Sequence, residues 1–348
     1  MDKITSNAML IKFGPYILFA VGLVLLIYGG NWFVDGASGI AKKFHVPEIL
    51  IGATVVSIGT TLPEVMVSSM GAFNGNGSIA YGNAIGSIIC NTALIAAITI
   101  AIKPAKAERK TMILPVCFFF AAAALYSYTA YVTKDFSRVF GVILLVLFLI
   151  YMLMVVRQVM KKNDGKELPK DEPAPSISDE DSAAKESGVA KMLILLVLGA
   201  AMIAIGAKLL NENAVVIAKN FGVPDTVIAL TIVALGTSLP ELVTAITSLV
   251  KGHGSLSLGN IIGANLFNLV LVSGMAITIR PFPLPVGTTV GGMNASLVID
   301  IPVMLFVMIV MTIPTLIRGK LSRWQGILLL LTYASYITTQ ILLTLNVF

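Results

Sequence analysis

Long apolar runs separated by short polar connections dominate this sequence. Ten runs are long enough to cross a bilayer, if about 20 residues are required for one helix. They lie near residues 13–35, 47–73, 79–102, 111–132, 137–160, 190–211, 225–250, 256–279, 294–317 and 322–346. The pattern therefore predicts an all-α membrane protein with ten transmembrane helices.

One polar stretch interrupts this pattern between the fifth and sixth runs. Residues 161–188 are rich in Lys, Asp, Glu, Ser and Pro, a composition typical of a solvated linker. The predicted organisation is a first five-helix repeat over residues 1–160, a cytoplasmic linker over 161–188 and a second five-helix repeat over 189–348.

The two halves repeat one another at an offset of 177 residues. Residues 41–95 align without a gap on residues 218–272, with 22 identities in 55 positions. Because each half holds an odd number of helices, the second half must enter the membrane from the opposite side. The sequence therefore predicts inverted repeats, an architecture that places a transport site at the repeat interface near the midplane.

Charge is scarce and unevenly distributed. Only 12% of the residues are charged, against about 25% in an ordinary soluble domain, which excludes a nucleic-acid module and a typical cytosolic enzyme. The loops after the odd-numbered helices hold 17 of the 24 basic residues. The positive-inside rule then places the linker in the cytoplasm and both termini outside a cell inner or plasma membrane. Cys90 and Cys117 lie in apolar runs, so we expect neither a disulfide nor a cysteine metal cluster.

Polar residues share one helical face in the second and seventh spans. Their spacing of i, i+3, i+4 and i+7 forms a single stripe. The stripe comprises Ser57, Thr60, Thr61 and Glu64, and at the equivalent positions of the seventh span Ala234, Thr237, Ser238 and Glu241. An ionised carboxylate at membrane depth costs at least about 2.5 kcal/mol on insertion scales, so we expect Glu64 and Glu241 to line a cavity or pair with a cation.

Each stripe contains a proline that removes one backbone donor. Pro63 leaves the carbonyl of Gly59 without its usual partner, and Pro240 does the same for Gly236. We expect a pair of broken helices that present carbonyl oxygens, because irregular backbone at membrane depth is tolerated where it lines a cavity.

The span that follows each stripe adds further oxygen ligands. Ser87 and Asn91 lie at i and i+4, and their repeat equivalents are Ala264 and Asn268. Carboxylates, hydroxyls, amides and carbonyls are the ligands of a hard cation such as Ca²⁺. Two glutamates carry a charge of −2, which one Ca²⁺ or two Na⁺ ions would neutralise. For Asn83 and Asn260 a role at the helix entry and a role as ligands have equal weight.

Other carboxylates have simpler interpretations. Asp300 has no acidic equivalent in the first half, and a structural role is favoured over ligation two to one. Asp35 and Glu212 match across the repeat and are expected to be solvated caps at helix ends, with a gating role as the alternative. Glu48 suits the helix dipole in the first turn of its span.

At this point the motifs resemble a known family. G-T-T-L-P-E at 59–64 and G-T-S-L-P-E at 236–241, each followed by a G-[SA]-x-x-x-N helix, resemble the alpha repeats of the cation/calcium exchanger superfamily, specifically of prokaryotic sodium/calcium exchangers. The resemblance covers essentially the whole chain. Relatives often carry Asp at the position of Asn268 and Ser at that of Ala264. The missing carboxylate argues against potassium coupling.

The resemblance implies electrogenic exchange of about three Na⁺ for one Ca²⁺ by alternating access. It also implies the ligand set, with Glu64 and Glu241 binding both ions. The other implied ligands are Ser57, Thr60, Thr61, Ser87, Asn91, Ala234 through its carbonyl, Thr237, Ser238 and Asn268. We expect the first and sixth helices to slide across the other eight when ions bind.

Rival functions remain open at this stage. A proton-coupled or other cation/Ca²⁺ exchanger is the main alternative, because two buried carboxylates can also carry protons. A channel would need a continuous polar path, and an intramembrane hydrolase finds no H-E-x-x-H motif or Ser/His pairing. We expect no enzyme activity, no cofactor, no nucleic-acid partner and a monomer in the lipid bilayer, with Na⁺ and Ca²⁺ as the transported ions.

Overall fold

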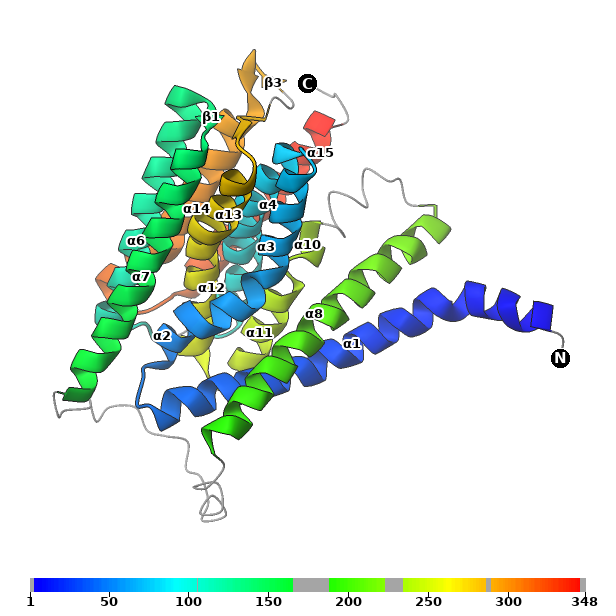
Figure 1. Ribbon diagram of the computed structural model, residues 1–348, viewed down its shortest axis with the longest axis horizontal. Coiled ribbons are helices and arrows are strands. Elements are labelled where there is room, and N and C mark those ends of the chain that lie inside the picture. The colour runs from blue at the N-terminus through cyan, green and yellow to red at the C-terminus, as the bar shows by residue number, and fades with distance from the viewer. Residues whose placement is uncertain (1–2, 105, 165–187, 223–233, 286–288, 345–348) are drawn as a thin grey trace.

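The computed structural model describes residues 3–104, 106–164, 188–222, 234–285 and 289–344, and these ranges are almost wholly helical (Figure 1). Within them, nine helices are long and apolar enough to cross a membrane, and a shorter apolar helix covers Leu239–Val250. Residues 223–233, the first part of the predicted seventh span, lie outside the described ranges. The predicted all-α membrane fold is confirmed.

The first half forms five spans, three of which contain a wider π-helical turn. Its elements are α1 (Lys3–Lys43); α2 (Glu48–Ile51), η1 (Gly52–Val56) and α3 (Ser57–Phe73); α4 (Gly77–Cys90), η2 (Asn91–Ala96) and α5 (Ala97–Ile102); α6 (Arg109–Tyr128) and η3 (Thr129–Thr133); and α7 (Arg138–Asp164).

The second half repeats this plan. Its elements are α8 (Val189–Asn220); α10 (Ala234–Gly236) and α11 (Leu239–Val250); α12 (Gly254–Phe267), η6 (Asn268–Val272) and α13 (Ser273–Ile279); η7 (Ser296–Asp300) and α14 (Ile301–Arg318); and α15 (Arg323–Thr344). Short strands join the loops. β1 (Asp135–Phe136) pairs antiparallel with β2 (Phe282–Pro283), and β3 (Thr289–Val290) with β4 (Met293–Asn294).

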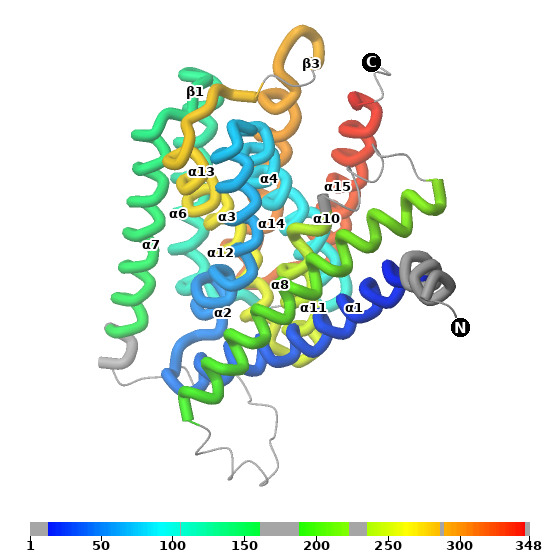
Figure 2. The backbone as a smooth tube through the Cα atoms, turned by 45° about the vertical axis from the view of Figure 1, so that its right-hand side comes forward, coloured from blue at the N-terminus to red at the C-terminus, as the bar shows by residue number. Residues whose placement is uncertain are grey.

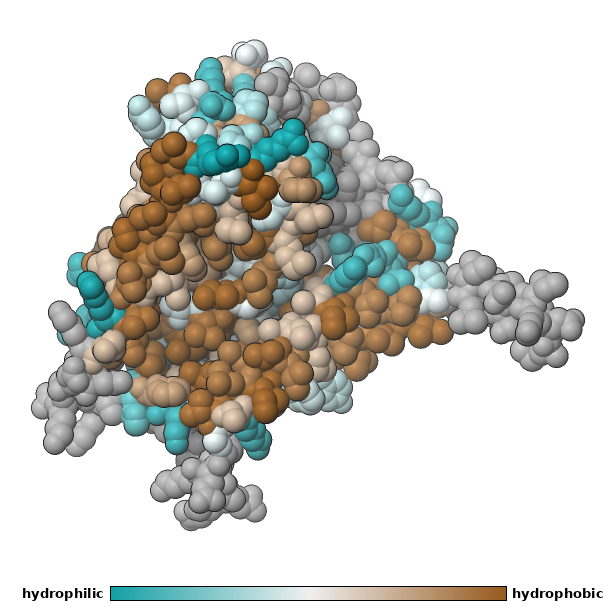
Figure 3. All heavy atoms as spheres, viewed as in Figure 1, coloured by the Kyte–Doolittle hydropathy of each residue, from teal (hydrophilic) through white to brown (hydrophobic). Residues whose placement is uncertain are grey.

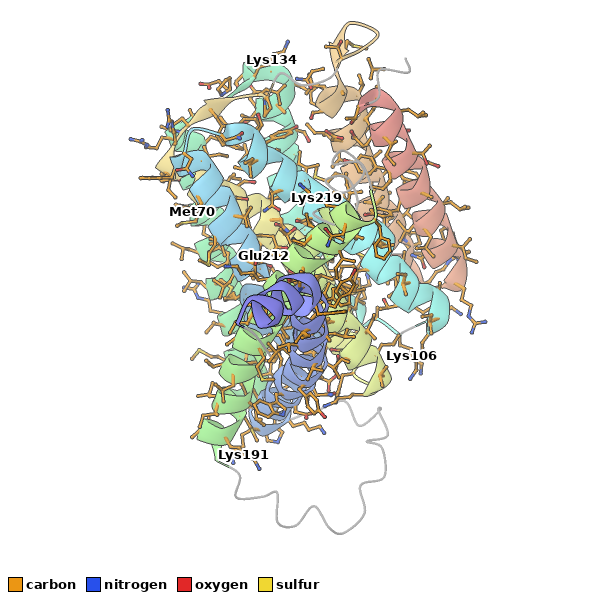
Figure 4. All side chains as sticks on the ribbon, turned by 90° about the vertical axis from the view of Figure 1, so that its right-hand side faces the viewer. Met70, Lys106, Lys134, Lys191, Glu212 and Lys219 are labelled. Carbon is orange, nitrogen blue, oxygen red and sulfur yellow. The ribbon has the colours of Figure 1, made fainter. Side chains whose placement is uncertain are left out.

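The two halves run in opposite directions through the molecule. The chain passes from α2 to α3 toward the end that carries β1 and β3, whereas it passes from α10 to α11 away from that end (Figure 1). We call the end with the β3–β4 turn the hairpin face and the opposite end, where α7 ends and α8 begins, the linker face. Lys134 lies at the hairpin face, and Lys106 and Lys191 lie toward the linker face (Figure 4). Residues 165–187 of the predicted linker lie outside the described part.

Apolar side chains cover the flanks between these two faces. In the space-filling view the hydrophobic residues form a broad band, and hydrophilic residues gather at its upper and lower ends (Figure 3). This distribution is expected of a protein whose flanks contact lipid, because no water is present there to solvate polar groups.

α1 and α8 form an antiparallel pair that slants across one side of the other helices (Figures 1 and 2). Glycines allow their backbones to approach closely. A Cβ on Gly22 would lie 2.9 Å from the carbonyl oxygen of Gly206, and one on Gly29 would lie 3.0 Å from that of Gly199. At the repeat offset of 177 residues, Gly199 is the equivalent of Gly22 and Gly206 is the equivalent of Gly29. The contact between the two helices is therefore symmetric, and small residues drive such packing in membranes.

Helix packing differs between the two ends of the repeat. At the linker end, a Cβ on Gly263 would lie 2.6 Å from the Cα of Ala53, and one on Gly259 would lie 2.9 Å from the Cα of Ile49. The repeat equivalents Gly86 and Gly82 have no described atom within 4 Å of such a Cβ, and Gly82 is exposed. The linker side of this interface is therefore closed backbone against backbone, whereas no described residue packs on the equivalent positions toward the hairpin face.

Candidate functional site

The two predicted glutamates lie at the same depth on oppositely directed helices. Glu64 is nine residues before Phe73, where α3 ends, and Glu241 is nine residues before Val250, where α11 ends. At 1.5 Å per residue, each is about 14 Å from the face at which its helix ends. Because the helices end at opposite faces, both carboxylates lie near the middle of a hydrocarbon core about 30 Å thick.

The carboxylates face one another in a fully buried site. Both glutamates are 0% exposed, and they interact electrostatically. The side chains of Thr60 and Thr61 from the other half also lie near the carboxylate of Glu241, without a hydrogen bond of ordinary geometry between them. The inverted repeat therefore brings the two stripes together at one place, as predicted.

Unpartnered polar atoms are concentrated at this site. None of the four carboxylate oxygens of Glu64 and Glu241 has a hydrogen-bond partner among the described residues. The same holds for the hydroxyls of Thr61 and Ser238. The amide groups of Asn91 and Asn268 are also unpartnered. A buried polar group without a partner costs about 1–3 kcal/mol, and more if it is charged. So many of them in one place indicate a site that is built for a ligand.

Two of the expected ligands have other partners. The hydroxyl of Ser57 donates to the carbonyl of Gly52 at 2.7 Å and to that of Asn260 at 2.9 Å. The hydroxyl of Thr60 donates to the side-chain oxygen of Asn260 at 3.2 Å. These contacts leave lone pairs of both oxygens for an ion, while the proton of Ser57 is shared between η1 and α12 and that of Thr60 points to α12.

The remaining predicted residues are placed by their elements. Ser87 is buried in α4 with 4% exposure, and Thr237 is half-buried in the turn between α10 and α11. Ala234 begins α10, and its side chain lies outside the described part.

The prediction of two broken helices is correct in only one half. In the second half α10 ends at Gly236, and α11 begins at Leu239 with Pro240 in its first turn. In the first half, however, α3 continues through Pro63, and the irregular turn is η1, which precedes the motif. A proline is compatible with a helix at membrane depth when neighbouring groups and local π-helical adjustments accommodate the freed carbonyl.

π-helical turns adjoin the site at equivalent positions of the repeat. η2 begins at Asn91 and η6 begins at Asn268. In η6 both the backbone nitrogen and the hydroxyl of Ser273 donate to the carbonyl of Asn268. Such turns occur often at functional sites. No single-residue pattern in the sequence predicts them.

Asn83 and Asn260 contact the site from within their helices, so a helix-entry role is wrong for both. The side-chain nitrogen of Asn83 donates to the carbonyl of Glu64 at 3.3 Å and to the hydroxyl of Ser68 at 2.9 Å. Asn260 holds Ser57 and Thr60, as described above. The identical G-N pair in both repeats was the available signal.

Asp35 lies within α1 and pairs with a lysine, so it is not a solvated helix cap, whereas Glu48 lies in the first turn of α2 as the sequence predicts. Asp35 accepts from the ammonium of Lys251 at 2.7 Å, and Glu48 lies 2.7 Å from Nδ1 of His253. Both partners belong to the turn between α11 and α12. Glu212 is exposed and lies 3.9 Å from Lys208.

Asp300 belongs to a separate network between η7 and α15. Its oxygens accept from the hydroxyl of Ser296 at 2.6 Å, the side-chain nitrogen of Gln340 at 2.7 Å and the hydroxyl of Tyr336 at 3.2 Å. This arrangement is consistent with the structural role that the sequence favours.

The donor set of the site suits a hard cation. Carboxylate, hydroxyl and amide oxygens prevail, and the described ranges contain no group of three or more His, Cys, Asp or Glu side chains that could hold a metal ion. Ca²⁺ takes about six to eight oxygen ligands in flexible geometry. The arrangement can therefore hold a partly or fully dehydrated hard cation at mid-depth.

The α1–α8 pair packs beside this site around a narrow crevice that has no room for a water molecule. The crevice is lined by Phe33, Gly59, Thr60, Pro63, Ala200, Ile203, Ala204 and Pro240. A displacement of α1 or α8 would therefore change the packing around Thr60, Pro63 and Pro240 directly.

Comparison with known proteins gives consistent matches over nearly the whole chain. The family model described as sodium/calcium exchanger protein matches residues 14–157 and 191–342. An uncharacterized membrane protein of Methanocaldococcus jannaschii is 34% identical over 90% of this chain and 94% of its own length. A sodium/calcium exchanger of Methanosarcina acetivorans is 30% identical over 92% of this chain and 97% of its own. The solved structure of the sodium-calcium exchanger NCX_Mj is similar with a TM-score of 0.73 and 31% identity, covering 93% of this chain and 98% of the other.

Proposed function

The chain belongs to the sodium/calcium exchanger family, and from that premise we propose that it is an antiporter that exchanges Na⁺ for Ca²⁺ by alternating access. As a member of this family, the chain is a multi-pass membrane protein that exchanges Ca²⁺ for another cation. The observation that carries the finer proposal is the pair of facing, fully buried glutamates whose oxygens have no described partner.

The charge of the site explains why the two ions would compete. Two ionised glutamates at mid-depth repel one another, and a bound cation removes this repulsion. One Ca²⁺ neutralises the charge of −2, and so do two Na⁺ ions, so occupancy by one species excludes the other. The proposed ligands are Ser57, Thr60, Thr61, Glu64, Ser87, Asn91, Ala234 through its carbonyl, Thr237, Ser238, Glu241 and Asn268.

Access to the site would alternate through exchange of the two half-interfaces. The linker side is closed where Gly259 and Gly263 pack on α2 and η1, while Gly82 and Gly86 meet no such packing from the described part of the chain. We infer that this conformation admits ions from the hairpin face. In the opposite state the two halves would exchange these packings, and the α1–α8 pair would slide across the other helices.

The orientation follows from the charges at the two ends. The excess of basic residues on the linker face favours a cytoplasmic position for this face, with both termini outside the plasma membrane. We propose that the protein acts as a monomer, because all ligands of the proposed site come from one chain. Residues 1–160 and 189–348 are the two repeats, and 161–188 is the cytoplasmic linker.

The proposal is tested by reconstitution of the purified protein in proteoliposomes loaded with Na⁺. External Ca²⁺ should enter when an outward Na⁺ gradient is imposed, and an electrogenic cycle should respond to a potassium-valinomycin potential. Uptake that followed a pH gradient and ignored the Na⁺ gradient would refute sodium coupling and identify a proton-coupled exchanger.

Variants connect this activity with the site. Glu64→Gln and Glu241→Gln keep the size of each side chain but remove the charge, so each should abolish uptake. The matched control is Glu212→Gln, because this glutamate is exposed on α8, away from the site. Full activity in either site variant would remove that glutamate from the proposed ligands.

A further inference from the structure

A second group of unpartnered polar side chains lies between the site and the linker face. The hydroxyls of Thr244, Ser248 and Ser257 have no hydrogen-bond partner among the described residues. Thr244 and Ser248 are 0% exposed and Ser257 is 3% exposed. None of them belongs to the proposed ligand set. A buried hydroxyl without a hydrogen-bond partner destabilises the folded protein, so the alignment of these three needs an explanation.

Two of these hydroxyls continue the polar face of α11 beyond Glu241. Thr244 follows Glu241 by three residues and Ser248 follows it by seven, so all three share one helical face. At 1.5 Å per residue they lie about 4.5 Å and 10.5 Å from Glu241 along the axis. α11 ends at Val250, about 13.5 Å from Glu241, so the polar face reaches almost to the linker face.

The neighbouring helix α12 provides a second, parallel row. Ser257 precedes Asn260 by three residues, and both are buried. The side-chain oxygen of Asn260 accepts from Thr60 in the site, whereas its side-chain nitrogen is unpartnered. The short turn between the helices closes with a bond of 2.7 Å from the nitrogen of His253 to the carbonyl of Ser248. The two rows therefore start at the site and end at the same turn.

A small cavity lies where the rows end. Its volume is about 20 Å³, enough for one water molecule. Ser257 lines it together with Thr99 and Lys103, near the loop that follows α5, and with Leu249 and Gly254. The ammonium of Lys103 is exposed at the linker face, so the cavity lies between the buried rows and the aqueous boundary.

The internal repeat does not impose this feature. The equivalents of Thr244, Ser248 and Ser257 in the first half are Val67, Gly71 and Ala80, none of which carries a polar side chain. A requirement of the symmetric binding site or of the fold would be expected in both halves. Hydroxyls at these three positions therefore belong to the second half alone, although α3 carries Ser68 and Ser69 at other positions beyond Glu64.

We propose that Thr244, Ser248, Ser257 and Asn260 line the route by which cations pass between the site and the linker face, and that this route is closed in the present conformation. Their oxygens replace part of the hydration shell of Ca²⁺ or Na⁺ during passage, a substitution suited to hard cations. This inference rests on the proposed exchange function. It goes further by naming residues outside the ligand set and by assigning them to the half of the route that opens at the linker face.

Cysteine labelling tests the route without depending on transport. Ser248→Cys and Ser257→Cys are reconstituted in vesicles and exposed to a charged, membrane-impermeant maleimide from one face at a time. The native protein, which retains Cys90 and Cys117, gives the background, and Ala80→Cys, at the buried repeat equivalent of Ser257, is the matched control in the first half. Modification is read by mass spectrometry.

The inference predicts labelling of both second-half cysteines from the linker face and not from the hairpin face. Labelling from the hairpin face alone, or none from either face, would overturn it. If the wild type fails to exchange Na⁺ for Ca²⁺ but the labelling is as predicted, the exchange proposal fails while the polar route stands.

Transport kinetics provide a second readout. Thr244→Val combined with Ser257→Ala should lower the maximal exchange rate about tenfold, whereas Ca²⁺ protection of the purified protein against heat should remain as in the wild type. Thr244→Ser alone should keep the wild-type rate, because serine retains the hydroxyl. An unchanged rate in the double variant would overturn the inference, as would a loss of Ca²⁺ protection, which would place these groups in the binding site itself.

Discussion

The closed packing of α12 on the linker side makes a sharp prediction for Gly263. Its Cβ in Gly263→Ala would first meet the hydroxyl oxygen of Ser57, and it would lie 2.6 Å from the Cα of Ala53 and 2.8 Å from the carbonyl carbon of Ala53. Ordinary contacts begin near 3.4 Å, so α12 and η1 must separate by about 0.8 Å (3.4 − 2.6). Overpacking of this kind costs about 1–3 kcal/mol. The variant should therefore destabilise the present conformation relative to the opposite one by roughly 5–150-fold.

Gly86 is the matched control because it occupies the equivalent position in the first half. No described atom lies within 4 Å of the Cβ that Gly86→Ala would introduce. This variant should leave the stability of the present conformation unchanged. If access alternates by exchange of the two half-interfaces, Gly86 becomes the packed glycine in the opposite state. The substitution should then destabilise that state by a similar amount.

Two assays separate these effects. Thermal unfolding in detergent should show a lower melting temperature for Gly263→Ala and an unchanged one for Gly86→Ala. Uptake of Ca²⁺ into proteoliposomes should be slower for both, because each variant penalises one of two required states. On a Ser248→Cys background, labelling from the linker face should rise with Gly263→Ala and fall with Gly86→Ala. Equal melting temperatures, or wild-type transport by Gly86→Ala, would refute the reasoning.

Three further outcomes follow from the site and its surroundings. Either Glu64→Gln or Glu241→Gln should raise the melting temperature of the ion-free protein, because one of the two facing charges is removed. Each should also abolish the stabilisation by Ca²⁺, which for the wild type reaches about 2.7 kcal/mol when the Ca²⁺ concentration is 100 times Kd. Calorimetry measures both effects. Gly199→Ala should slow exchange at least tenfold by wedging α1 from α8, whereas Gly14→Ala, which meets no described atom, should not. Lys251→Ala should change stability in denaturant by under about 1 kcal/mol, since its ion pair is partly exposed; a larger loss would assign the pair a structural role.

The sequence was sufficient to predict the spans, the inverted halves and the two stripes. Hydropathy depends on local composition, and the offset of 177 residues relates Glu64 to Glu241 without any knowledge of contacts. The partners of individual side chains were not predictable in the same way. The hydroxyl of Ser57 reaches Asn260, which is 203 positions away, and Asp35 pairs with Lys251. Such contacts depend on how α12 and α1 pack, which local patterns do not encode.

The irregular turn in the first half shows the same limit. Pro63 and the preceding Gly59 predict a break in the motif, yet α3 is continuous there and the wider turn lies at η1. The placement of this turn depends on Gly52, whose Cβ would lie 2.8 Å from the backbone nitrogen of Asn260. Close approach of two backbones, and not proline alone, sets the position of the irregular turn.

The paired π-helical turns η2 and η6 also determine how the chain tolerates changes in length. A π-turn spans one residue more than an α-turn, so a helix that loses one residue there can close into a regular α-helix without rotating the part beyond it. A deletion elsewhere in an α-helix turns every later side chain by about 100° and moves an apolar face away from lipid. Single-residue deletions in the chain should therefore be tolerated for insertion into the bilayer within 91–96 and 268–272, and fail in the flanking helices.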